Sequence, residues 1–258
     1  MIEVKKLTKM YGSKTALDKL DLTIQSGAVY GLLGHNGAGK STLIKMLVSI
    51  LNPTSGTIVI DGKPLDTNRQ ELKQQIGYVP DSPDLFLQLS AHEYWSLMAA
   101  AYNIPKELFQ QRLAELVDRF SMGGHQTETI ASFSHGMRQK TMIIGALLSD
   151  PDIWILDEPL QGLDPQAAFD LKEMITLHAK KGKTVIFSTH VLDSAEQLCD
   201  SLAILKQGNL LYDGSVSDLL ATHPNQSLET IYLSLTGRQA TDNPTEQAVS
   251  EPEVIEHD

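Results

Sequence analysis

The sequence of 258 residues contains a single cysteine, Cys199, and no long apolar segment. One cysteine excludes an internal disulfide and a cysteine metal cluster. Because Leu192, Ala195 and Leu198 share a helical face close to it, we expect a buried and unreactive thiol at Cys199. No run of about 18 mostly apolar residues is present, and the first ten residues lack the apolar run of a secretory signal. These absences predict a globular protein of the cytosol.

Positive charge is also scarce, with 21 Lys and Arg against 32 Asp and Glu, which gives a formal net charge of −11. Such an acidic chain is poorly suited to bind nucleic acid or anionic lipid non-specifically. Residues 239–258 contain six acidic residues and no Lys or Arg. The composition predicts a packed domain over residues 1–235, followed by an acidic and disordered tail over residues 236–258.

Short apolar runs alternate with helical patterns along most of the chain, which predicts an α/β fold with a largely parallel, buried sheet. The first 65 residues also carry segments of alternating hydrophobicity, and TIVIDG at residues 57–62 ends in an Asp-Gly hairpin signal. We therefore expect an N-terminal antiparallel β layer beside the parallel core. The expected core strands are residues 29–33, 152–156, 184–188 and 202–205.

Strand signals stop after Pro80, and helical patterns replace them. Two are AHEYWSLMAAAY and PKELFQQRLAELVDRF, and a third begins in SFSHGMRQK. Ser134 is a good N-cap for this third helix, but Gly136 costs a helix about 1 kcal/mol relative to Ala. The pattern predicts a helical insertion over about residues 82–148, with a glycine in its last helix that serves some purpose other than helix stability.

The segment GHNGAGKST matches G-x-x-x-x-G-K-[ST] and stands between an expected strand and an expected helix. Glycines let the backbone curl around phosphates, so that N–H groups at a helix N-terminus meet the negative charge. Lys40 is expected to reach the β and γ phosphates, and Ser41 to ligate Mg²⁺. The expected nucleotide-binding residues of the loop are Gly34, His35, Asn36, Gly37, Ala38, Gly39, Lys40, Ser41 and Thr42. The alternative is a glycine-rich turn that binds no nucleotide, but such a turn would not explain why Lys40 and Ser41 follow the glycines.

Polar residues follow two further core strands at the carboxyl edge, where parallel sheets bind ligands. Asp157 ends one strand, where its carboxylate can hold Mg²⁺. Glu158 follows, placed to orient or deprotonate an attacking water. His190 ends the next strand and is a candidate contact for the γ phosphate. Alternatively, Asp157 and Glu158 are surface carboxylates and His190 is a structural histidine. The phosphate loop in the same chain favours the roles in a nucleotide site.

These motifs, in this order, resemble the ATP-binding cassette (ABC) ATPases over about residues 2–235. That family has a P-loop NTPase core of RecA-like type, and its signature LSGGQ lies between the phosphate loop and the DEP motif. FSHGM at residues 133–137 occupies this place and retains two of the five residues, Ser134 and Gly136.

The resemblance implies roles for further residues. Tyr11 would stack on adenine, Asp164 would be the coupling aspartate of the D-loop GLDP, and His190 would be the switch histidine. Cassettes of this family dimerise head to tail, so Ser134 and Gly136 would meet ATP held by a second copy or by a homologous subunit. A packing aromatic and a helix N-cap are the alternatives for Tyr11 and Asp164. His135 could sense phosphate, contact a partner or face water.

At Asp81 the chain departs from the family, which usually has glutamine after this strand. The glutamine links Mg²⁺ and the attacking water to the helical insertion, which touches the membrane partner. Aspartate can accept a hydrogen bond from water or bind Mg²⁺, but it is shorter and cannot donate. We hypothesise that Asp81 keeps the coupling role through a water and is a further candidate Mg²⁺ ligand.

Within the family, the motifs are most similar to Ecs-type and bacteriocin or peptide exporter ATPases of bacteria. The resemblance implies an ATP- and Mg²⁺-dependent ATPase at the inner face of the cell membrane that drives a separate multispanning permease. A soluble ABC ATPase acting on ribosomes or DNA is one alternative, but the paired cassettes or long coiled coil of those classes are missing. A non-hydrolysing regulator is another, which the presence of both Glu158 and His190 disfavours.

Overall fold

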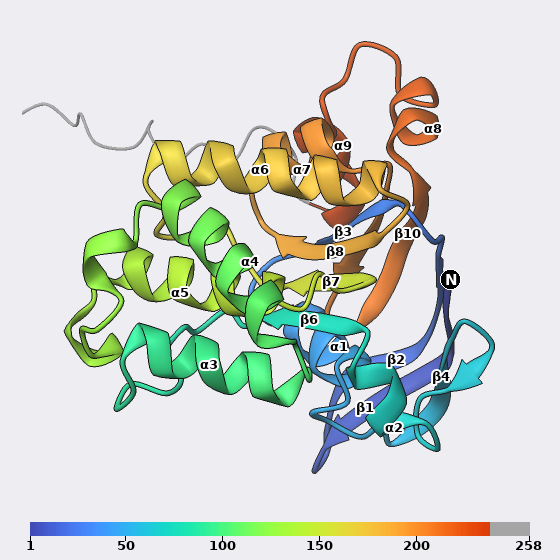
Figure 1. Ribbon diagram of the computed structural model, residues 1–258. Coiled ribbons are helices and arrows are strands. Elements are labelled where there is room, and N and C mark those ends of the chain that lie inside the picture. The colour runs from blue at the N-terminus through green and yellow to red at the C-terminus, as the bar shows by residue number, and fades with distance from the viewer. Residues whose placement is uncertain (238–258) are drawn as a thin grey trace, which may run out of the picture.

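The computed structural model describes residues 1–237, so the acidic tail predicted from the sequence falls almost wholly outside the described residues. Two sheets form the framework (Figure 1). The first is antiparallel, with four strands in the order β2-β1-β4-β5. Asp61 and Gly62 form the predicted tight turn between β4 and β5, and both have positive φ. Its strands are β1 Ile2–Tyr11, β2 Lys14–Ile24, β4 Ser55–Ile60 and β5 Lys63–Pro64.

The second sheet has six strands in the order β10-β9-β3-β8-β7-β6. The neighbours from β9 through β6 are parallel, and β10 adds an antiparallel edge. This arrangement confirms the largely parallel core, because each predicted core strand is one of its members. The strands are β3 Val29–Leu33, β6 Ile76–Val79, β7 Ile153–Leu156, β8 Thr184–Thr189, β9 Ser201–Lys206 and β10 Asn209–Ser215.

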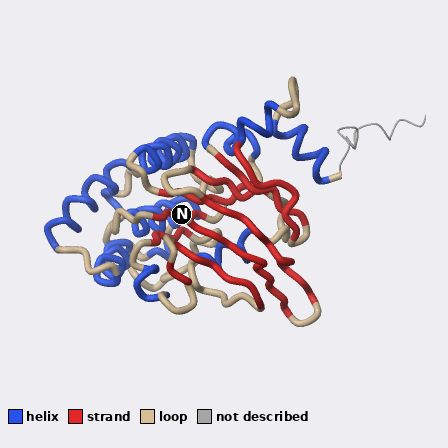
Figure 2. The backbone as a smooth tube through the Cα atoms, turned by 90° about the vertical axis from the view of Figure 1, so that its right-hand side faces the viewer, coloured by secondary structure: helices blue, strands red, loops and turns tan. Residues whose placement is uncertain are grey.

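Successive residues of β3 point to opposite faces and contribute to two hydrophobic cores. Tyr30 and Leu32 face the antiparallel sheet, with helix α1 (Lys40–Leu47) packed in the same core. Val29 and Leu33 face the other core, which is covered by helices. Figure 2 shows the strands of the two sheets close together, with most of the helices gathered on one side of them. The phosphate loop therefore lies at the junction of two well-packed layers.

Three α-helices occupy the chain between β6 and β7: α3 (Ala91–Ala101), α4 (Lys106–Arg119) and α5 (His135–Leu147). They form the green part of Figure 1, on the left. Two short 3₁₀ helices, Gly123–His125 and Ile130–Ser132, connect α4 to α5. The buried indole of Trp95 on α3 donates to the carbonyl of Thr141 on α5, 3.0 Å away. The helices of the predicted insertion are present, while the domain limits drawn from the sequence stay a prediction.

The remaining helices pack against the sheets and follow the strands in the usual α/β alternation. Helix α2 and the two C-terminal helices are additions to what the sequence patterns predicted. The helices are α2 Arg69–Lys73, α6 Pro165–Lys180, α7 Leu192–Leu198, α8 Val216–Ala221 and α9 Leu228–Thr236.

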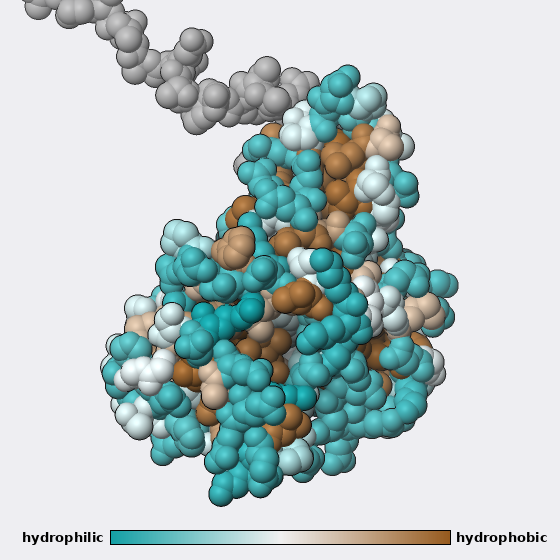
Figure 3. Space-filling view, turned by 45° about the horizontal axis from the view of Figure 1, so that its top comes forward, coloured by the Kyte–Doolittle hydropathy of each residue, from teal (hydrophilic) through white to brown (hydrophobic). Residues whose placement is uncertain are grey.

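Cys199 is buried, and burial raises the pKa of its thiol, as expected for an unreactive cysteine. The face shown in Figure 3 is mostly hydrophilic, and apolar residues reach it only in small separate areas. Among the described residues, none of the helices has the length and apolar character needed to cross a bilayer.

Candidate functional site

The phosphate loop runs from the end of β3 to the start of α1 and takes a conformation that needs glycine. Gly37 and Gly39 have φ values of 81° and 114°. A side chain at Gly34 would place its Cβ 2.7 Å from the carbonyl oxygen of Leu205 on β9. Lys40 is 5% exposed, and its ammonium donates to the Gly34 carbonyl at 2.6 Å. The loop is thus folded tightly on itself, with its lysine held at the base.

Asp157 follows β7 and is 1% exposed, with one carboxylate oxygen partnered and the other free. The Ser188 hydroxyl on β8 donates to Oδ1 at 2.6 Å, whereas Oδ2 is buried and has no hydrogen-bond partner among the residues that the structure describes. Burial raises the pKa of this carboxyl, and the hydrogen bond from Ser188 and the nearby hydroxyl of Ser41 oppose the rise. A buried carboxylate oxygen without a partner, next to the Ser41 hydroxyl, fits the oxygen ligands that Mg²⁺ prefers.

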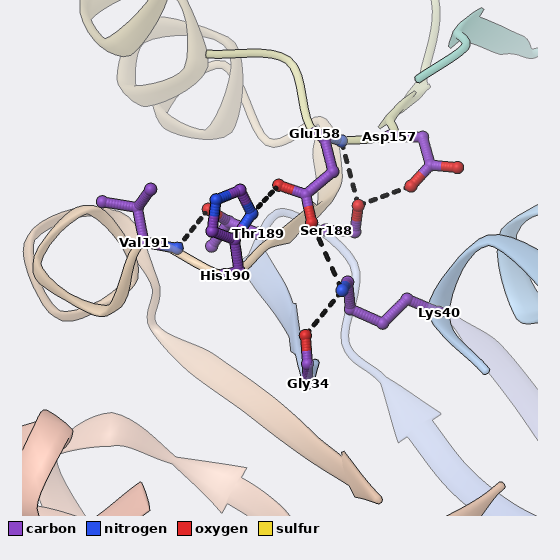
Figure 4. Close-up of polar contacts among 8 residues, drawn as sticks. All are labelled: Gly34, Lys40, Asp157, Glu158, Ser188, Thr189, His190 and Val191. Atoms are coloured by element: carbon purple, nitrogen blue, oxygen red, sulfur yellow. Dashed lines mark hydrogen bonds and ion pairs between the residues drawn. The ribbon is translucent and has the colours of Figure 1, made fainter. Parts of the chain in front are cut away.

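Glu158 lies between Lys40 and His190 (Figure 4). Its Oε1 is 3.3 Å from the Lys40 ammonium, and its Oε2 is 2.9 Å from Nδ1 of His190. The residue has a φ of 48°, an uncommon conformation for a side chain of this size. Its backbone N–H donates to the Ser188 hydroxyl at 2.9 Å, so the strained turn is anchored. One carboxylate therefore joins the phosphate loop to the strand end that carries His190.

A cleft of about 990 Å³ opens above these groups. Tyr11 lines it and is 49% exposed, with the Lys9 ammonium 5.3 Å from its ring centroid. An exposed aromatic face at this place is suited to stacking on a base. Asp81 also lines the cleft, and its charge contributes to the raised pKa of Asp157. The other lining residues are Lys14, Thr15, Ala16, His35, Asn36, Gly37, Gly39, Lys40, Ser41, Thr42, Glu158, Gln161, His190 and Gln207.

The signature segment is not part of this cleft, as far as the described residues show. Ser134 is the N-cap of α5 and accepts a hydrogen bond from the Met137 amide at 3.3 Å, as the sequence predicted. Ser134 is exposed at the molecular surface. Within one chain, the signature and the phosphate loop are therefore separate surfaces.

Gly136 has a reason to be glycine inside the chain itself. A Cβ at this position would stand 2.5 Å from the carbonyl oxygen of Gly162, in the loop between β7 and α6. The imidazole of His135 packs on the same glycine, because a Cβ on Gly162 would lie 2.3 Å from its Cδ2. His135 is exposed, which agrees with one of the three roles left open for it, that of facing water, and its ring also contacts the D-loop of its own chain.

Asp164 ends this loop and connects it to α5. Its carboxylate accepts from the Ala167 amide at 2.9 Å, which confirms the N-cap of α6. It also lies 2.7 Å from the ammonium of Lys140 on α5, and this contact is the main reason that the pKa of Asp164 is lowered.

Sequence reasoning missed Ser188 and Lys140, and it missed the contacts that link α5 to the D-loop through His135 and Gly162. The signal for Ser188 was its place two residues before His190 in FSTH, at the end of a buried strand. The other contacts join segments that no local pattern relates.

Comparison with known proteins agrees with this geometry. The family model described as "ABC transporter" matches residues 17–161. The ABC-type transporter ATP-binding protein EcsA of Bacillus subtilis (strain 168) is 36% identical over 93% of this chain and 98% of its own. The Nod factor export ATP-binding protein I of Cupriavidus metallidurans is 30% identical over 90% of this chain and 77% of its own.

A solved structure described as the ATP-binding subunit of an ABC transporter superposes with a TM-score of 0.86. It is 35% identical and covers 92% of this chain and 99% of the other. The chain therefore belongs to the ABC transporter family, as an ATP-binding subunit with ATPase activity.

Proposed function

We propose that this chain is the ATP-hydrolysing subunit of a bacterial exporter, which binds Mg-ATP in the cleft and drives a separate membrane permease. The observation that carries the proposal is the contact of one carboxylate, Glu158, with both Lys40 and His190. Lys40 would bind the β and γ phosphates, Glu158 would orient and deprotonate the attacking water, and His190 would hold Glu158 in place.

Asp157 and Ser41 would hold Mg²⁺, which supplies charge stabilisation at the phosphates when bound. The buried Oδ2 of Asp157 accepts no hydrogen bond from residues 1–237, which supports this assignment. Asp81 is a further candidate in the ligand shell because it lines the same cleft. Tyr11 lines the same cleft and would stack on adenine.

The active assembly would be a head-to-tail dimer of this chain, or a pair with a homologous subunit. Ser134 and Gly136 stand at the start of α5, where N–H groups and the helix dipole favour an anion. Since they do not line the cleft of their own chain, a second chain is needed to bring them to ATP.

The permease would dock where apolar side chains are exposed beside Asp81. Leu85 and Phe86 are 47% and 46% exposed in the segment after it, and Leu97 on α3 is 46% exposed. Asp84 in the same segment lies 2.6 Å from Arg138 of α5, which ties the segment to the signature helix. Docking there would hold the chain at the inner face of the membrane. Export is favoured by similarity to a protein named for Nod factor export.

Two variants test the assignment of the nucleotide site. Lys40→Ala removes the phosphate-binding cation, and we expect it to lose ATP binding in isothermal titration calorimetry. Glu158→Gln keeps the shape of the side chain but cannot act as a base, so it should bind ATP and turn over at least about 100-fold more slowly. Tight binding by Lys40→Ala, or normal turnover by Glu158→Gln, would contradict the proposed roles.

Copurification from membranes tests the partner. A multispanning protein should copurify with the full chain. If ribosomes or DNA copurify instead, the exporter proposal is wrong even where the ATPase assignment holds.

A further inference from the structure

Helix α9, which has no role in the proposed mechanism, contacts the phosphate loop. The ring of His35 packs edge to face on the ring of Tyr232 in α9, with centroids 5.4 Å apart and an interplanar angle of 67°. This is a favourable aromatic geometry. Tyr232 is 5% exposed, whereas His35 lines the nucleotide cleft. A buried side chain of the C-terminal helix thus contacts the loop that would hold phosphate.

His35 stands at the start of the exposed tip of the loop. Its carbonyl accepts from the Ala38 amide at 3.0 Å, which closes the tip as a turn. The tip residues between them, Asn36 and Gly37, are exposed. Gly37 has a φ of 81°, a conformation that favours glycine, and glycine has the greatest backbone freedom of any residue type. The Tyr232 ring therefore contacts the residue at which this exposed tip begins.

Helix α9 is itself anchored to two other segments that border the cleft. The Leu228 amide donates to the carboxylate of Glu196 at 3.0 Å, and Glu196 belongs to α7, which begins two residues after His190. At its other end, the Thr236 carbonyl accepts from Lys206 at 2.7 Å, and the next residue, Gln207, lines the cleft. Helix α9 thus contacts the phosphate loop, helix α7 and the end of β9, each of which is close in sequence to residues that line the cleft.

We propose that Tyr232 is a positioning residue that preorganises the phosphate loop through His35, so that docking of α9 and binding of ATP favour each other. Holding the tip in its bound conformation reduces the conformational entropy that binding must remove. Coupling of two binding equilibria is reciprocal, so ATP also stabilises the docked helix. The inference rests on the proposed placement of ATP in the cleft.

The test compares Tyr232→Ala with Tyr232→Phe, which keeps the ring, in the full-length protein. An aromatic contact of this kind predicts an increase in the KM for ATP of about 2- to 10-fold in Tyr232→Ala, with kcat nearly unchanged. Tyr232→Phe should restore the wild-type KM. Leu219→Ala is the matched control, since it removes a buried apolar side chain from the neighbouring α8, and its KM should equal that of wild type.

Hydrogen exchange gives a second reading that a merely structural role would not change. A non-hydrolysable ATP analogue with Mg²⁺ should slow amide exchange in α9 of the wild type and Tyr232→Phe, but not of Tyr232→Ala. If Tyr232→Ala does not fold, Tyr232→Leu replaces it with the same expectations.

The inference would be overturned if the folded Tyr232→Ala or Tyr232→Leu variant had the wild-type KM for ATP and the ATP analogue still slowed amide exchange in α9. An equal rise of KM in Leu219→Ala would also overturn it. Failure of the site assignment is distinguishable, because Lys40→Ala would then still bind ATP.

Discussion

At Asp157, the burial that stabilises the folded core opposes the charge that the proposed function requires. Its carboxylate is almost fully buried, and burial raises its pKa because the charged form loses its hydration. The proposed binding of Mg²⁺ would nevertheless need that charged form. The hydrogen bond from Ser188 and the nearby hydroxyl of Ser41 offset part of the cost. In the absence of metal, the residue therefore destabilises the fold at neutral pH.

Asp157→Asn should raise the melting temperature at pH 7 in the presence of EDTA. Because the folded-state pKa is raised, wild-type stability falls as pH rises from the unfolded-state value through the folded-state one, whereas asparagine does not titrate. The advantage of the variant should thus be small near pH 4, grow above it and then level off. Differential scanning fluorimetry measures it, with the exposed Asp152→Asn as control. A variant less stable than wild type at pH 7 would contradict this account.

The signature helix α5 and the D-loop are packed closely against each other. His135 and Gly136 at the start of α5 both pack on Gly162, and Lys140 one turn later pairs with Asp164. The ion pair is exposed on its Asp164 side and contributes little to stability. The close packing leaves no room for a side chain, so we expect the D-loop to follow any movement of α5.

Gly162→Ala tests this packing. The residue has a φ of 77°, and an added Cβ would lie 2.3 Å from His135 Cδ2. We expect a loss of about 2–4 kcal/mol in the free energy of unfolding from strain and clash together, together with reduced turnover. Gly182→Ala is a matched control with a φ of 80° and no neighbour within 4 Å of its added Cβ. The packing argument predicts a larger loss in urea unfolding for Gly162→Ala than for Gly182→Ala, and partial recovery on adding His135→Ala. Equal losses for the two glycines would show that only backbone strain matters.

At the scale of the whole molecule, local patterns predicted much of the fold and the core of the site. The phosphate loop, the core strands and the N-caps at Ser134 and Asp164 depend on residues close together in sequence, so spacing reveals them. The contact of Tyr232 with His35 could not be predicted this way, because it joins residues 197 positions apart whose approach depends on how α9 packs. The positive φ of Glu158 escaped prediction for a related reason, since it depends on the anchor from Ser188 on another strand.

The central proposal, that one chain holds only part of its active site, also concerns the whole molecule. The cleft contains the phosphate loop, Glu158 and His190, while Ser134 is exposed elsewhere. A second chain, placed head to tail, would bring its own Ser134 to the tip of the loop at Asn36.

The most direct test is a disulfide between those two positions. Ser134→Cys and Asn36→Cys are introduced together with Glu158→Gln to slow turnover, and Cys199→Ser removes the only native thiol. We predict that mild oxidation with Mg-ATP yields a covalent dimer on non-reducing gels, and that the yield is far lower without nucleotide or with either cysteine alone. Under ATP concentrations at which calorimetry shows the variant to be loaded, a chain that stays monomeric, or that forms the bond within itself, would contradict the composite site.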